Sequence, residues 1–87
     1  MQYVYILKSK KDKLLYIGCS KDIKKRLELH NSGKVESTKK RRPLEMIYYE
    51  AFVSPEDAFA REKYLKTGWG KEHIKKILSN YIKNLGG

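Results

Sequence analysis

Tyr5 and Tyr16 are the first residues in this chain whose types and spacing could do chemistry. They belong to the short stretches Tyr3-Val4-Tyr5 and Tyr16-Ile17-Gly18, which are rich in residues typical of strands. A free tyrosine has a pKa of about 10, so it acts as a base at neutral pH only with help from a nearby cation or a metal-bound water. The alternative interpretation is that both rings are ordinary strand aromatics, half-buried in a core.

Arg26 and His30 lie four positions apart, so on a helix both would project from one face. A forked guanidinium can grip a phosphate group and stabilise the negative charge of a transition state. A histidine, with a pKa of about 6.5, could relay a proton from a tyrosine base or touch a phosphate. The alternatives are that Arg26 pairs with Asp22 on a solvated face and that His30 only complements the helix dipole.

Glu62 is a carboxylate within an otherwise apolar helical stripe that includes Ala58 and Leu65. A buried or half-buried acid is costly unless it is paired or coordinated, and the residues that follow offer no obvious partner within the helix. Glu62 is therefore a candidate oxygen ligand for Mg²⁺, with waters completing the shell. The alternative is a salt bridge to Arg26 or to a lysine across the interface between helix and sheet.

The elements that must position these residues follow from the hydrophobic pattern and from the turn and cap residues between them. The predicted elements are strands at 2–9, 14–19 and 44–53 and helices at 21–31, 55–67 and 71–84. Ser20 is the predicted N-cap of the first helix, and Ser54 followed by Pro55 begins the second. The sequence thus predicts one domain over residues 1–87 with an α+β fold of order β-β-α-β-α-α, a three-stranded antiparallel sheet flanked by three helices.

The chain carries a net charge of +10, from 20 Lys and Arg against 10 Asp and Glu. Such a surplus on a small domain attracts polyanions, and nucleic acid is the commonest of these. The predicted nucleic-acid contacts are basic residues on or after the first helix: Lys21, Lys24, Lys34, Lys39, Lys40, Arg41 and Arg42. The alternative is a solvated surface with an exposed basic loop at 34–43. Trp69, between two glycines, could stack on a base, but a core position between two helices is the favoured interpretation.

Several other classes of protein are disfavoured by the sequence. It has no run of 18 apolar residues that would suggest a membrane span, and its first residues lack the apolar segment of a signal peptide. With Cys19 as its single cysteine, the chain forms neither an internal disulfide nor a cysteine-based zinc site, which is typical of the reducing cytoplasm. A bound metal would therefore use oxygen ligands and the two histidines.

These motifs, in this order, resemble the GIY-YIG nuclease family, and the resemblance covers nearly the whole chain. Tyr3-Val4-Tyr5 stands where the family has Gly-Ile-Tyr, and Tyr16-Ile17-Gly18 matches the second motif. The stretches 15–27 and 60–63 carry most of the remaining similarity. The chain looks most like small standalone bacterial proteins that are similar to the nuclease domain at the N-terminus of UvrC. Family members have a three-stranded antiparallel sheet flanked by helices, in agreement with the fold predicted above.

The resemblance implies a metal-dependent endonuclease that cuts DNA with little sequence preference and leaves a 5′-phosphate and a 3′-hydroxyl. It implies that Tyr16 is the general base that activates water and that Tyr5 orients this base or the phosphate. Arg26 would stabilise charge, His30 would assist proton transfer, and Glu62 would hold a single Mg²⁺ or Mn²⁺.

The family pattern also includes an asparagine about three helical turns after the glutamate. The residue twelve positions after Glu62 is Ile74, and Asn80 is the candidate substitute. A second hypothesis is a non-catalytic module that binds DNA or RNA through the same basic face, and a third is a basic surface that docks an acidic protein. Because no second domain is predicted, any specificity would come from DNA structure or from a partner protein, or the protein would have none.

Overall fold

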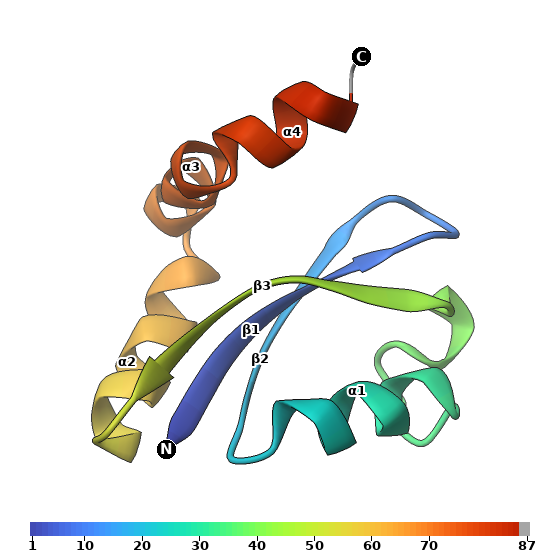
Figure 1. The fold of residues 1–87 in the computed structure, drawn as a ribbon, viewed down its shortest axis with the longest axis horizontal. Helices are drawn as coiled ribbons and strands as arrows, with labels where there is room; N and C mark the ends of the chain where they lie inside the picture. Colours follow the sequence, from blue (N-terminus) through green and yellow to red (C-terminus); the bar gives the residue numbers. More distant parts are fainter. Residues whose placement is uncertain (86–87) are drawn as a thin grey trace.

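A computed structural model describes residues 1–85 and confirms the predicted α+β class (Figure 1). Its three strands are β1 (Gln2–Ser9), β2 (Leu15–Ser20) and β3 (Leu44–Phe52), and both strand pairs are antiparallel. The first strand lies in the centre, because the sheet order is β2-β1-β3. In the described residues no helix is long and apolar enough to cross a membrane.

Alternation along the central strand β1 supplies two apolar faces. Val4 and Ile6 belong to one hydrophobic cluster, whereas Tyr5 and Leu7 belong to another, as successive side chains of a strand point to opposite sides. All four side chains are at most 1% exposed. Both faces of the sheet therefore need helices to cover them, and Figure 1 shows helices on either side.

Helix α1 (Ile23–Asn31) covers the face that contains Tyr5, but it begins later than predicted. Its N-cap is Asp22, whose carboxylate accepts a hydrogen bond from the Lys25 amide at 3.0 Å. The predicted cap Ser20 is wrong for this role, because its Oγ instead accepts a hydrogen bond from the Asp22 amide at 3.1 Å and closes the turn before the helix.

Helices α2 (Pro55–Leu65) and α3 (Gly68–Ile77) cover the opposite face, and α4 (Ser79–Leu85) follows them. The prediction of one last helix over 71–84 is wrong, because the chain leaves helical geometry at Leu78, which has φ −107° and ψ 18°. Leu78 is 6% exposed and joins the core there, and Tyr81 packs against the same cluster. The apolar stripe thus continues across the break, which hides the break in the sequence.

The basic loop at 34–43, predicted to be an exposed loop, contains a turn of 3₁₀-helix, η1 (Lys39–Arg41). The turn is tied to the β1–β2 connection: Ser9 Oγ donates to the Arg41 carbonyl at 2.6 Å, and Arg41 Nε pairs with Asp12 Oδ2 at 2.7 Å. Thr38, just before the turn, is fully buried. This loop is therefore packed on the body of the protein and not detached from it.

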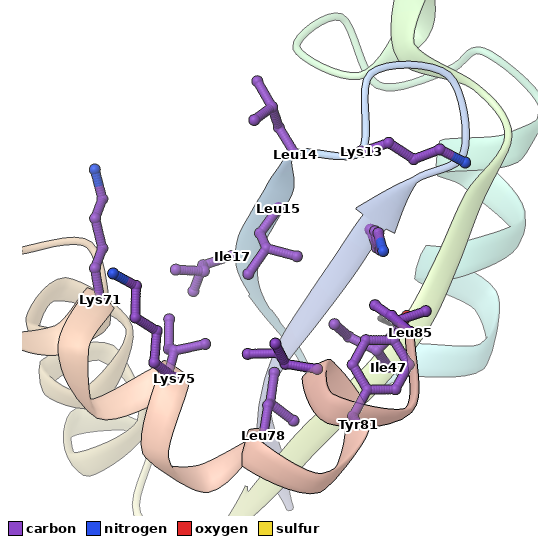
Figure 2. Close-up of a pocket in the computed structure, with 13 residues that line it drawn as sticks. Lys13, Leu14, Leu15, Ile17, Ile47, Lys71, Lys75, Leu78, Tyr81 and Leu85 are labelled. Atoms are coloured by element: carbon purple, nitrogen blue, oxygen red, sulfur yellow. The ribbon is translucent and has the colours of Figure 1, made fainter. Parts of the chain in front are cut away.

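A groove with a volume of about 540 Å³ lies between the β1–β2 hairpin and helices α3 and α4 (Figure 2). Its wall is mainly apolar, with lysine ammonium groups at the edge, and includes Leu15, Ile17, Ile74, Leu78, Lys71 and Lys75. None of the residues singled out for chemistry lines it. The groove is thus separate from the site described next.

Candidate active site

Tyr5 lies at the centre of the site because β1 brings it opposite Gly18 of β2. The Tyr5 ring crosses β2 directly over this glycine, and a Cβ atom at position 18 would overlap the Tyr5 Oη and Cζ atoms. The glycine of the Tyr16-Ile17-Gly18 motif therefore serves a steric purpose: it leaves room for the tyrosine of the first motif.

His30 is fully buried in the last turn of α1, and its two ring nitrogens both have hydrogen-bond partners. Its Nε2 lies 2.9 Å from the Tyr5 Oη atom, and its Nδ1 lies 2.6 Å from the Thr38 Oγ1 atom. Either neutral tautomer satisfies both bonds, since each hydroxyl can donate or accept. Thr38 is a positioning residue that sequence reasoning missed, because it stands in a polar loop without any periodic signal.

Burial decides the protonation states of this pair. Burial, followed by the charge of Arg26, lowers the pKa of His30 from 6.5 to about 4. Burial also raises the pKa of Tyr5, against the opposing effect of the Arg26 guanidinium. At neutral pH the imidazole is thus uncharged and the phenol keeps its proton. The expected pKa of about 6.5 for His30 is therefore wrong in the folded chain. Because its side chain has no exposed surface, His30 also cannot contact a phosphate directly in this structure.

We expect His30 to make the folded state less stable in acid. Because the folded pKa of about 4 lies below the unfolded value of 6.5, the unfolded chain binds an extra proton between these two values. The stabilisation is therefore complete above pH 6.5 and is lost as the pH falls toward 4. Between pH 7 and pH 4.5 the unfolding free energy of the wild type should fall by roughly 2–3 kcal/mol more than that of His30→Gln, as urea titrations would measure. Equal losses of unfolding free energy in the two proteins would contradict the lowered pKa of His30.

Tyr16 lies beside this buried pair, on the partly exposed strand β2. Its ring centroid is 5.0 Å from that of His30 and 6.4 Å from that of Tyr5. The two tyrosines predicted to share a face are thus brought together with the histidine, and Tyr16 is the more accessible tyrosine. The hydrogen bond of His30 goes to Tyr5, so the imidazole is not aligned to take a proton directly from Tyr16.

Arg26 is half-buried next to Tyr5 and makes no ion pair with any carboxylate of residues 1–85. The alternative pairing with Asp22 is not formed, because that carboxylate caps α1 at the Lys25 amide. The Arg26 Nε atom is buried without a hydrogen-bond partner in the described part of the chain. A buried N–H donor that lacks an acceptor is costly, and an anionic ligand would supply that acceptor.

Glu62 is half-buried on α2, with a side chain that is 24% exposed. Its Oε2 atom pairs with Lys66 Nζ at 3.2 Å, so the prediction that no partner exists within the helix is wrong. The carboxylate lies close enough to Tyr5 for its charge to raise the pKa of that residue. Within residues 1–85 no cluster of three or more His, Cys, Asp or Glu side chains could hold a metal. A single carboxylate fits Mg²⁺, which commonly takes one or two from the protein and the rest from water and phosphate.

The predicted nucleic-acid contacts do not all have the same environment. The exposed ones are Lys21, Lys24, Lys34, Lys39, Lys40 and Arg42. Arg41 is half-buried and ion-paired with Asp12, so its guanidinium holds the loop in place. Ile74, which stands where the family pattern has its asparagine, is a core residue that is 3% exposed, and the candidate substitute Asn80 lies exposed near the start of α4.

Arg61, adjacent to Glu62 in the chain, anchors α2 through a network that sequence reasoning missed. Its guanidinium donates to both carboxylate oxygens of Glu50 on β3, at 2.8 and 2.9 Å, and lies 3.0 Å from His73 Nε2 on α3. Tyr48 donates to the same carboxylate at 2.7 Å. This half-buried arrangement joins one strand and two helices, and it fixes the helix that carries Glu62.

Comparison with known proteins identifies the class to which this fold and site belong. The model of the GIY-YIG catalytic domain matches residues 1–77, so the chain belongs to the GIY-YIG family, whose domains are those of endonucleases.

Relatives of similar length carry the name UPF0213 protein. The one from Clostridium perfringens is 38% identical over 84 residues, which cover 95% of this chain and 89% of the relative. The one from Staphylococcus saprophyticus is 42% identical over 76 residues, which cover 86% of this chain and 92% of the relative. The solution NMR structure of a UPF0213 protein from Bacillus halodurans matches with a TM-score of 0.55 and 34% identity, covering 88% of this chain and 85% of that one.

Proposed function

We propose that this protein is a metal-dependent endonuclease that hydrolyses DNA phosphodiester bonds and leaves a 5′-phosphate and a 3′-hydroxyl. The observation that carries the proposal is the cluster of Tyr5, Tyr16 and His30 beside Arg26, which makes no ion pair within residues 1–85 and whose buried Nε atom has no hydrogen-bond partner there. A purely structural cluster would gain nothing from leaving the buried Arg26 Nε donor without an acceptor. Membership of the GIY-YIG family supports the same reaction class.

In this proposal the two tyrosines have different tasks. Burial raises the pKa of Tyr5 and keeps it protonated, and its Oη atom lies 2.9 Å from His30 Nε2, so it serves as a hydrogen-bonding or positioning group. Tyr16, half-exposed at the edge of the cluster, is then the residue that activates the attacking water. Arg26 grips the scissile phosphate and stabilises the charge that develops on its oxygens.

Glu62 would hold the metal ion, either Mg²⁺ or Mn²⁺. When bound, this ion supplies Lewis-acid stabilisation of the phosphate and of the leaving oxygen. Lys66 Nζ lies 3.2 Å from the Glu62 carboxylate, so a bound metal ion would either displace this ammonium group or share the carboxylate with it. The task of the chain is thus to present one carboxylate on a helix that Arg61 holds rigidly against the sheet.

The second candidate function is a non-catalytic module that binds nucleic acid, DNA or RNA, with the same scaffold. The net charge of +10 and the exposed lysines favour it as much as they favour the nuclease. It differs in what it requires of the protein: binding alone needs neither Tyr16 nor Glu62. A partner protein that supplies specificity is compatible with either function.

The experiment that tests the proposal offers labelled single-stranded, duplex, nicked and branched DNA, and one RNA, to the wild-type protein. Each substrate is incubated with Mg²⁺, with Mn²⁺ and with EDTA. We expect cutting with either metal, none with EDTA, and product ends that accept a new label only after phosphatase treatment. Binding that is weakened by salt, without cleavage under any of these conditions, would favour the non-catalytic module.

A further inference from the structure

Trp69 is the most exposed aromatic side chain of residues 1–85. Its side chain is 81% exposed, and the position in the core that the sequence favoured is wrong. The aromatic and cation–π contacts of the described residues all involve other rings. A tryptophan carries a large apolar surface that is seldom left in water, so its exposure points to a ligand outside the chain.

The backbone around Trp69 is rigid, although the side chain is free. Trp69 lies in the first turn of α3, where Thr67 Oγ1 accepts a hydrogen bond from the Gly70 amide at 3.1 Å. Gly70 packs so closely on the backbone of α2 that a Cβ atom there would overlap Tyr64 and Leu65. Because the backbone of this turn is already fixed, stacking would have to immobilise only the two side-chain torsions of the indole, which keeps the entropy cost small.

The surface next to Trp69 is open. A Cβ atom placed on the neighbouring Gly68 would meet no atom within 4 Å. The absence of a side chain on this residue leaves the turn bare, so a flat group can approach it beside the indole.

The charges around Trp69 favour an anionic ligand. Lys66 and Lys71 flank it in the chain, and both are exposed. The nearest acid along α3, Glu72, pairs with Lys75 at 3.2 Å, and Glu62 pairs with Lys66 at 3.2 Å. A ligand with flat faces and regularly spaced negative charges is a single strand of nucleic acid.

We propose that Trp69 stacks on an unpaired base while Lys66 and Lys71 contact the neighbouring phosphates. The proposal rests on the function proposed above for its class of ligand, and it defines the substrate as DNA with a single-stranded segment. Trp69 follows Lys66 by three residues, so their Cα atoms are at most about 11 Å apart. Since Lys66 reaches Glu62, the stacked base would lie within a few nucleotides of the candidate metal ligand.

The first arm of the test uses the fluorescence of Trp69, which is the only tryptophan in the chain. The wild-type protein is titrated with a thymidine oligonucleotide and with a blunt duplex of equal length, both in EDTA so that nothing is cut. We expect quenching with the single strand and little with the duplex, whose bases are already stacked. An unchanged spectrum with bound single strand would overturn the inference.

The second arm measures the affinity of Trp69→Leu, Trp69→Phe and Tyr49→Leu for a fluorescein-labelled single strand by anisotropy. Loss of one stacking contact should weaken Trp69→Leu by about 5- to 100-fold, whereas Trp69→Phe keeps most of the affinity. Tyr49 is the control, because it is also an exposed aromatic residue (55%) but lies on β3. An equal loss on single strand and duplex, or an equal loss in Tyr49→Leu, would contradict a role for Trp69 in binding unpaired bases.

The two proposals can fail separately. If the wild type cuts nothing but its tryptophan is quenched by single strands, the nuclease fails and the stacking site stands. If the wild type cuts DNA and Trp69→Leu binds and cuts single strands as well as the wild type, the stacking site is contradicted and the nuclease proposal stands.

Discussion

Glu62→Gln should lose metal-dependent cleavage of DNA by roughly 10²–10³-fold while keeping the fold. The amide preserves the size of the side chain but removes the negative charge that would hold the ion. Glu62 is half-buried and its ion pair with Lys66 lies at the surface, so the stability of the variant should change little. Cleavage rates at saturating Mg²⁺ measure the effect, and the unchanged thermal transition shows that the variant is folded.

Lys66→Met is the matched control for Glu62→Gln. It breaks the same ion pair but leaves the carboxylate, so at saturating DNA it should keep cleavage and require less Mg²⁺, because the competing ammonium group is gone. The phosphate contact proposed for Lys66 is lost as well, so the affinity for DNA should fall while the maximal cleavage rate stays. Loss of activity in Lys66→Met to the same extent as in Glu62→Gln would show that the ion pair, and not a metal ligand, matters at this position.

Gly18→Ala should be one of the most damaging single changes in the sheet. The new Cβ atom would overlap the Tyr5 ring, so the ring would have to move and its 2.9 Å contact with His30 would break. Overpacking of this kind, together with a lost buried hydrogen bond, should cost roughly 2–4 kcal/mol and lower the melting temperature by about 10 °C or more. Thermal unfolding followed by circular dichroism measures the change, and any cleavage activity should fall with it.

Gly68→Ala provides the comparison, since a Cβ atom there would meet nothing within 4 Å. It lies in a helical turn, where alanine is favoured over glycine by up to about 1 kcal/mol, so the melting temperature should stay the same or rise. If Gly18→Ala melts like Gly68→Ala, the close packing of Tyr5 against β2 is not a feature of the folded protein.

Strand pairing in this chain was predictable because its signals are local. The run of β-branched and aromatic residues in β1 and the short connection to β2 predict an antiparallel hairpin, and the hairpin brings Tyr5 and Tyr16 to one face. Arg26 and His30 both lie on α1, so their spacing of four positions has the helical meaning that the sequence predicted. These four residues could therefore be grouped from local sequence patterns, without information on distant contacts.

What the sequence did not indicate depends on distant packing or on single caps. Thr38 contacts His30 only because the basic loop folds back over α1, and nothing in its neighbourhood marks that return. The break at Leu78 leaves the apolar period intact, so no pattern shows it. Trp69, whose place between two predicted helices favoured a core position, lies exposed in the first turn of α3, because that helix begins at Gly68.

Lys66 is different, because the information was present in the sequence. It stands four positions after Glu62, the spacing at which a carboxylate and an ammonium group meet on a helix, and the two atoms are 3.2 Å apart. The pairing weakens the argument from an uncompensated acid. Within residues 1–85, the Arg26 Nε donor, buried without an acceptor next to Tyr5 and His30, is the feature that most favours an anionic ligand.

The most direct test of the nuclease assignment compares wild type and Tyr16→Phe on labelled DNA with a single-stranded segment, in Mg²⁺. The substitution removes one hydroxyl from a partly exposed ring and leaves the contacts of Tyr5, His30 and Thr38 in place. We predict that the wild type cuts and that Tyr16→Phe binds the same DNA with equal affinity but cuts at least about a hundredfold more slowly. Equal cleavage by both proteins, or none by the wild type, would contradict the assignment.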